Sequence, residues 1–134
     1  MKRMAWPVAL ILLAASTSGL AEQSANAKYL GVSKCVMCHS DVHKSWQSSK
    51  HARAFELLTN VGEEKNEKCL PCHTTGFAKG GFADVATTPD LKSVTCEACH
   101  GPGSEHNGVK EKITRTPSGS VRGGCHQSLN IHAT

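Results

Sequence analysis

The sequence predicts a mainly α fold of short helices joined by long loops, with little or no β structure. Apolar side chains recur at helical spacing between residues 40 and 58, whereas glycine and proline interrupt the later segments. No stretch alternates apolar and polar residues for long enough to predict an extended strand. The apolar residues that fall near one helical face are Val42, Trp46, Phe55 and Leu58.

One longer helix is predicted in the first half of the chain. Ser40 or Asp41 can cap its N-terminus, and the apolar spacing carries it to about Leu58. Residues 22–34 are expected to form a short mobile lead-in. The polar segment 62–68 is expected to form a solvated turn or a short helix.

The second half is predicted to consist mainly of loops. Residues 74–95 contain several glycines and a proline, and one hairpin is expected around Lys79-Gly80-Gly81. Gly101-Pro102-Gly103 should turn the chain sharply. Residues 114–124, rich in Gly, Ser and Thr, are predicted to form another loop.

Three copies of the pattern Cys-x-x-Cys-His carry the chemistry of the chain. In each copy two thiols can add to the two vinyl groups of one porphyrin, and the histidine can bind its iron, so the pattern is typical of haem c attachment. The copies are Cys35-Val36-Met37-Cys38-His39, Cys69-Leu70-Pro71-Cys72-His73 and Cys96-Glu97-Ala98-Cys99-His100. We therefore expect three haem c groups, each held by the two cysteines of one motif, with the motif histidine as an axial ligand.

Zinc sites, redox dithiols and disulfides are the alternatives for paired cysteines. None of them requires a histidine directly after the second cysteine, yet all three copies have one. The first cysteines are spaced unevenly, 34 and then 27 residues apart, which does not favour a stacked-repeat architecture. The chain has few aromatic residues, so its own side chains would form only a small core. We expect the chain to wrap around stacked haems that supply the missing apolar surface.

Residues 1–21 resemble a secretory signal peptide, which leaves residues 22–134 as one multihaem domain. Lys2 and Arg3 precede an apolar run, and Gly19-Leu20-Ala21 offers small residues for cleavage. An uncleaved N-terminal anchor is the alternative. Export to the periplasm fits haem c, which is attached outside the bacterial inner membrane, and no later stretch predicts a membrane span.

The net charge does not indicate a nucleic-acid partner. The whole chain has a formal charge of +4, and removal of Lys2 and Arg3 lowers it to +2. Each haem adds two propionates and a ferric centre, so three haems bring the protein to about −1. We expect redox proteins, an electron donor and an acceptor, as the partners.

Five histidines outside the three motifs could supply the second axial ligand of an iron. His51 lies twelve residues after His39 on the predicted helix, so it would serve a neighbouring haem. His106 follows the Gly-Pro-Gly turn and is the second candidate. His43 lies one helical turn after His39 and is expected to be a surface or propionate-contacting residue. The remaining two are His126 and His132.

Arg122-Gly123-Gly124-Cys125-His126 has the frame of a fourth motif with arginine in place of the first cysteine. Three interpretations stay open: a haem held by one thioether, a degenerate site without haem, and a mutation or sequence error. His132 is the one histidine after this segment that could serve a fourth haem. Without a haem, Cys125 is an unpaired thiol in an oxidising compartment.

The chain resembles the cytochrome c-554 type of multihaem cytochrome over about residues 34–106. The resemblance lies in KCVMCHSDVHKSWQSSKHARAFELL, CLPCHTTGFAKGGF and TCEACHGPGSEH. It implies periplasmic electron transfer through closely packed, largely bis-histidine haems. It also implies that His51 ligates the third-motif haem, His106 the first-motif haem, and that the haem on His73 is five-coordinate. Unlike the family, this chain has Arg122 in its fourth motif and ends at Thr134.

The leading hypothesis is therefore an electron carrier without enzymatic turnover. The alternative is a reductase or ligand-binding subunit that uses a five-coordinate haem for nitric oxide, nitrite or hydroxylamine chemistry. No catalytic acid or base is evident beside His73, and the sequence shows no output domain for a self-contained sensor.

Overall fold

The computed structural model describes residues 26–109 and 112–127. The signal peptide expected at residues 1–21 lies outside these ranges, as does His132. The α-helices are α1 (Val32–Val36), α2 (Ser40–Gln47), α3 (Ala54–Thr59), α4 (Leu70–His73), α5 (Cys96–His100) and α6 (Gly119–His126), and two 3-10 helices are η1 (His51–Arg53) and η2 (Pro89–Leu91).

The described residues contain no β-strand, and one isolated antiparallel bridge joins Thr74 to Lys92. The prediction of a mainly α fold with long loops is therefore confirmed. No helix in the described ranges is long and apolar enough to cross a membrane.

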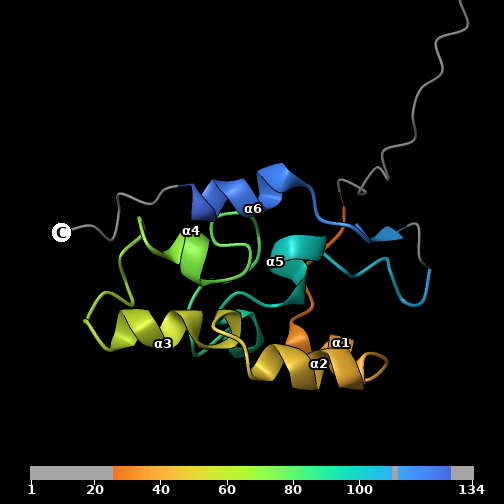
Figure 1. The fold of residues 1–134 in the computed structure, drawn as a ribbon, viewed down its shortest axis with the longest axis horizontal. Coiled ribbons are helices and arrows are strands. Elements are labelled where there is room, and N and C mark those ends of the chain that lie inside the picture. Colours follow the sequence, from red (N-terminus) through yellow and green to blue (C-terminus); the bar gives the residue numbers. More distant parts are fainter. Residues whose placement is uncertain (1–25, 110–111, 128–134) are drawn as a thin grey trace, which may run out of the picture.

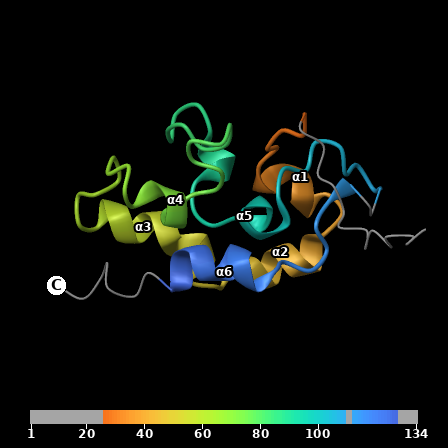
Figure 2. The ribbon, with the colours of Figure 1, turned by 90° about the horizontal axis from the view of Figure 1, so that it is seen from above.

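The three helices that carry motif cysteines lie in a row, with α5 between α4 and α1 in both views (Figures 1 and 2). In Figure 1, α6 runs along one side of the molecule, and α2 and α3 run along the opposite side. The chain thus surrounds the third motif with segments that are distant in sequence.

The prediction of one continuous helix from Ser40 to Leu58 is wrong, because the helix is interrupted at residues 48–50. The Ser48 hydroxyl donates to the Ser45 carbonyl at 2.8 Å, and the Ser49 hydroxyl accepts from the Ala52 amide at 3.3 Å. Serine side chains that bond to nearby backbone compete with helical hydrogen bonds. The helix start was correct, but His39 rather than Ser40 or Asp41 is the cap residue. The break places His51 on η1, a separate element.

Two predicted irregular segments contain helices. Within the expected lead-in 22–34, residues 32–34 belong to α1, and residues 28–31 are bound to the rest of the chain by hydrogen bonds. Within the expected loop 114–124, α6 begins at Gly119. Its two internal glycines have low helix propensity, which hid it from sequence reasoning.

The expected hairpin around Lys79-Gly80-Gly81 is a closed turn without paired strands. The Gly81 amide donates to the Gly76 carbonyl at 3.0 Å, and the Phe82 amide donates to the Thr75 carbonyl at 2.8 Å. The expected sharp turn after the third motif is present, since Gly101 ends α5 with φ +80°. Such a positive φ is readily adopted by glycine.

The apolar core is small and lies where α3, α4 and the 74–91 loop meet. Phe55 and Phe82 contact each other at its centre, with ring centroids 5.5 Å apart. The buried members of this cluster are Phe55, Leu58, Leu70, Phe82 and Leu91. Because this core adjoins the second motif, it fixes the position of His73 at the end of α4.

A buried polar cluster ties the second motif to the third. The Thr75 hydroxyl donates to the Ser93 carbonyl at 2.9 Å, lies 2.9 Å from the Thr95 hydroxyl, and accepts from the Thr95 amide at 2.9 Å. Thr75 follows His73 by two residues and Thr95 immediately precedes Cys96. These bonds therefore fix the two motifs relative to each other.

Candidate haem sites

Each motif forms a single helical turn that brings its two cysteines and its histidine together. The backbone amide of His39 donates to the Cys35 carbonyl at 3.0 Å, and that of His73 donates to the Cys69 carbonyl at 3.2 Å. The third motif is α5 itself, from Cys96 to His100. Residues three and four positions apart lie on one side of a helical turn, so each motif offers two thiols and one imidazole on the same side.

Two motif histidines hold their Nδ1 atoms against backbone carbonyl groups. His73 Nδ1 donates to the Ala54 carbonyl at 2.6 Å, and His100 Nδ1 donates to the Thr114 carbonyl at 2.6 Å. A carbonyl oxygen only accepts hydrogen bonds, so Nδ1 carries a proton, and in a neutral ring Nε2 is then the nitrogen that can bind a metal. This arrangement suits iron ligation through Nε2, because metal-binding histidines generally donate their other nitrogen to a carbonyl or carboxylate.

His106 lies opposite His39, the histidine of the first motif. Their ring centroids are 6.2 Å apart and the ring planes differ by 16°. Two imidazoles bound end-on to one metal, with metal–nitrogen bonds of about 2 Å, have centroids about 6 Å apart. The two rings are stacked, and their centroid separation lies in the range of two imidazoles on one metal. The resemblance implied the same two histidines for the first-motif haem, an assignment that stays a prediction.

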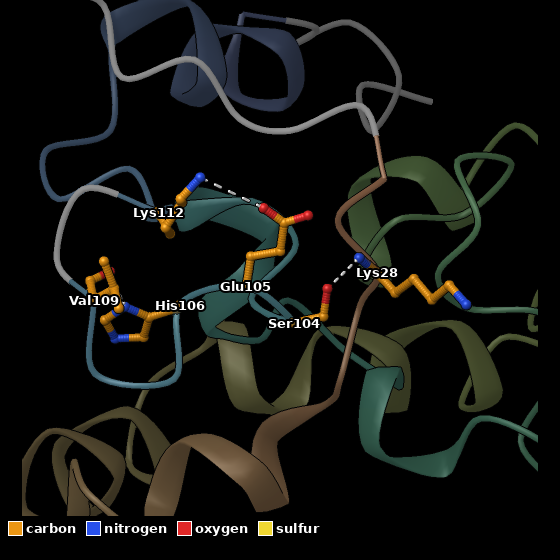
Figure 3. A network of polar contacts seen from close by, with 6 residues as sticks. All are labelled: Lys28, Ser104, Glu105, His106, Val109 and Lys112. Atoms are coloured by element: carbon orange, nitrogen blue, oxygen red, sulfur yellow. Dashed lines mark hydrogen bonds and ion pairs between the residues drawn. The ribbon is translucent and has the colours of Figure 1, made fainter.

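A network of polar contacts holds the segment that carries His106 (Figure 3). His106 Nδ1 donates to the Val109 carbonyl at 2.9 Å. Next to it, the Lys28 amide donates to the Ser104 hydroxyl at 2.7 Å, and the ammonium of Lys112 lies 3.9 Å from the Glu105 carboxylate. The bond from Nδ1 orients the His106 imidazole against a backbone carbonyl, as the corresponding bonds do for His73 and His100.

His51 lies opposite His126, the histidine of the Arg122–His126 frame. Their ring centroids are 5.9 Å apart with the planes at 69°. The resemblance instead implied His51 as a ligand of the third-motif haem. The His51 carbonyl does contact the segment just before that motif, since it accepts from the Val94 amide at 3.2 Å. The ring contact of His51 is with His126, and the ligand role that the resemblance implied for His51 stays a prediction.

His43 contacts Trp46, with ring centroids 5.5 Å apart. The Trp46 indole in turn donates to the Val94 carbonyl at 2.8 Å, which attaches α2 to the segment before the third motif. The structure thus places His43 beside a packing residue of its own helix.

Thiols from different motifs lie beside one another. The Cys35 and Cys96 thiols interact, and this interaction lowers the pKa of Cys96 to about 7 while raising that of Cys35. A second pair forms where the Cys125 thiol contacts Cys72. The attachment positions of the first and third motifs are therefore adjacent, and Cys125 adjoins the second motif.

Sequence reasoning missed one important residue, Glu97. Its carboxylate is 2% exposed and accepts from the Leu30 amide at 3.0 and 3.1 Å, from the Gly31 amide at 2.8 Å and from the Gly103 amide at 2.7 Å. An acidic side chain inside the third motif was visible in the sequence, but nothing there indicated that it would be buried. It joins the backbone before the first motif to the loop that leads to His106.

The sequence profile of the family described as cytochrome c554 and c-prime matches residues 34–101, just over half of the chain. The chain belongs to this family. Cytochrome c-554 of Nitrosomonas europaea is 36% identical to it over 105 residues, which cover 66% of this chain and 45% of the relative. The chain thus spans less than half the length of that curated relative. No solved structure gives a significant match.

Membership in the cytochrome c554 family implies covalently bound haem c. The motif residues fit that group, because each motif combines paired thiols with a histidine, and the Nδ1 atoms of His73 and His100 are held by carbonyl groups. Within the described residues no disulfide forms among the cysteines, and no three His, Cys, Asp or Glu side chains gather as a metal-ion site.

Proposed function

We propose that this chain is a periplasmic multihaem cytochrome that transfers electrons between redox proteins. Its haems would be attached by Cys35 and Cys38, by Cys69 and Cys72, and by Cys96 and Cys99. His39, His73 and His100 would each supply one axial ligand. When bound, haem iron alternates between Fe(III) and Fe(II), and the surrounding protein sets its potential.

The pair formed by His39 and His106 carries this proposal. Its centroid separation of 6.2 Å fits two imidazoles on one iron, a ligand set that gives lower potentials than histidine with methionine. An iron held by both His39 and His106 would have no position left for a substrate, so this pair favours electron transfer at the first motif. The hydrogen bond from Nδ1 to the Val109 carbonyl orients the His106 imidazole.

The carbonyl partners of His73 and His100 would influence the reduction potentials of the haems that these histidines ligate. A hydrogen bond from Nδ1 makes the imidazole a stronger donor to a metal and fixes the orientation of its ring. A stronger donor stabilises Fe(III), so these bonds should lower the potentials of the haems that they support. Both bonds are short, at 2.6 Å.

The contacts between motifs support close packing of the haems. The Cys35 and Cys96 thiols interact, and the buried Thr75 cluster joins the segments that follow His73 and precede Cys96. Electron tunnelling falls steeply with distance, so adjacent attachment positions favour rapid exchange between neighbouring haems. The apolar run before residue 22 supports export to the periplasm, where haem c is attached.

Stopped-flow spectroscopy of the holoprotein tests the proposal. The protein would be produced with its leader in a host with haem-attachment machinery, reduced without oxygen, and mixed with an oxidised monohaem cytochrome c. We expect the acceptor to be reduced by about one electron for each haem. A holoprotein that passes no electrons to the acceptor, but is oxidised by nitrite or hydroxylamine with turnover, would contradict it and indicate the enzymatic alternative.

A further inference from the structure

The turn that carries His106 closes around the dipeptide Asn107-Gly108. The Val109 amide donates to the His106 carbonyl, and the His106 imidazole donates through Nδ1 to the Val109 carbonyl at 2.9 Å. Both bonds join the same two residues, one on each side of the dipeptide, and Figure 3 shows the imidazole beside Val109. The orientation of His106 therefore depends on the length of the main chain between these two residues.

The conformation of this turn explains why asparagine is followed by glycine there. The φ angles are +29° at Asn107 and +86° at Gly108, so both central residues lie in the left-handed region. Such a turn favours Asn-Gly, because asparagine tolerates a positive φ and glycine adopts it without strain. Asn107 is exposed, and apart from the chain neighbours of Gly108 no atom lies within 4 Å of where its Cβ would be. The dipeptide thus has both water and room around it.

We propose that Asn107 is a site of spontaneous deamidation, and that its isoaspartyl product releases His106 from the first-motif iron. The inference rests on the proposed function, in which His106 is an axial ligand of that iron. It adds a slow covalent change that converts a haem with two histidine ligands to one with a free axial position. The turn that orients the ligand would therefore also contain the means of releasing it.

The reaction needs only the dipeptide and water. The Gly108 amide nitrogen attacks Cγ of Asn107 and loses its proton to water, and a succinimide ring closes as ammonia leaves. Water then adds to one of the two ring carbonyls. Addition at the original main-chain carbonyl breaks its bond to the Gly108 nitrogen, so the peptide now runs through Cβ and Cγ, which is isoaspartate. Addition at Cγ gives ordinary aspartate, and neither route gains or loses electrons.

Two features of Gly108 favour the attack. Glycine has no β-carbon to hinder the approach of its nitrogen to Cγ of the preceding residue. The Gly108 amide also donates no hydrogen bond to another residue that the structure describes, so no such bond has to break first. Asn60 offers a comparison within the same chain. It is exposed too, but it is followed by the β-branched Val61, which crowds the same approach.

The isoaspartyl product changes the length of the turn, whereas the aspartyl product changes only its charge. Isoaspartate inserts one methylene into the main chain between His106 and Val109. The two hydrogen bonds that close the turn across this short segment cannot then both keep their geometry, and the imidazole loses its orientation. Aspartate keeps the original main chain and should leave His106 in place. The two products therefore predict different states of the first-motif haem.

Ageing of the holoprotein in mildly alkaline buffer tests the inference. Peptide mapping, combined with labelling by an isoaspartyl methyltransferase, would locate the isoaspartate. We expect it at residue 107 and not at Asn60. Electron paramagnetic resonance should show one low-spin haem becoming high-spin in step with the isoaspartate. Asn107→Gln should show neither change, because glutamine would have to close a larger ring, and freshly prepared Asn107→Asp should keep the wild-type spin states.

The outcomes separate this inference from the proposed function. Aged protein without isoaspartate at residue 107 would overturn it, as would isoaspartate that accumulates while the spin states stay constant. A high-spin haem in fresh Asn107→Asp would also overturn it, since charge alone would then release the ligand. The proposed function fails on a different result: fresh, unmodified holoprotein that transfers no electrons to a redox protein.

Discussion

Glu97 lies inside the third motif, yet its carboxylate accepts a 2.8 Å hydrogen bond from the backbone amide of Gly31, just before the first motif. The same carboxylate accepts from Leu30 and Gly103. Gly31 is the cap residue of α1, and Gly103 begins the segment that carries His106. One buried side chain therefore fixes three parts of the chain that meet around the first and third motifs.

Replacing Glu97 with alanine should destabilise the holoprotein strongly. Three amides would lose their acceptor, and each unsatisfied buried group costs about 1–3 kcal/mol. We expect the free energy of unfolding to fall by about 3 kcal/mol or more in denaturant titrations followed by circular dichroism. Glu105→Ala is the matched control, since Glu105 forms only a surface ion pair at 3.9 Å, worth about 0–1 kcal/mol. Equal stability of the two variants would refute this role of Glu97.

Removal of the His106 imidazole should open one axial position on the first-motif haem. We expect His106→Ala to convert one low-spin haem to the high-spin state and to create one binding site for carbon monoxide. Electron paramagnetic resonance and ligand titration would detect both changes. His43→Ala is the control, because His43 packs on Trp46, and it should leave the spin states unchanged. A His106→Ala protein with a wild-type spectrum would show that His106 is not a ligand.

The stability of the protein should depend strongly on Phe55, which is 3% exposed and packs on Phe82 in the small core. Truncation of a buried Phe to Ala typically costs 3–5 kcal/mol, so Phe55→Ala should lose about that much stability. Leu57 lies on the same helix but is 56% exposed. Leu57→Ala should change the free energy of unfolding by about 0.5 kcal/mol or less. If thermal unfolding shows similar losses for both variants, the assignment of the core is wrong.

The stability of the protein should depend more on the buried hydroxyl of Thr75 than on the volume of its side chain. Thr75→Val keeps the shape but leaves the Thr95 amide without its acceptor, at a cost of about 1–3 kcal/mol. Thr59→Val is the comparison, since the Thr59 hydroxyl is exposed and bonds only to the Glu56 carbonyl of its own helix. We expect differential scanning calorimetry to show a clear decrease in Tm for Thr75→Val and almost none for Thr59→Val.

The haem motifs were predictable because their geometry is local. Two cysteines and a histidine within five residues form one helical turn wherever that turn is placed, and the chain needs no distant contact to present them. The mainly α character followed in the same way from the spacing of apolar residues and from the glycines that interrupt the second half.

The pairing of histidines was harder to predict, because it depends on where distant segments meet. The break at Ser48 and Ser49 separates His51 from the helix expected to carry it, and α6 brings His126 to face it. The burial of Glu97 was hard to predict for a related reason. A glutamate is normally exposed, and only the backbone amides of residues 30, 31 and 103 make its burial favourable.

Spectroelectrochemical titration of the holoprotein tests most directly whether this chain is a multihaem electron carrier. The number of electrons taken up per chain would be compared with the number of haems found by intact mass. We expect one electron for each haem, at the low potentials typical of bis-histidine ligation for the haem of His39 and His106. A protein that carries haem but takes up no electrons reversibly, or carries no haem at all, would contradict the proposed function.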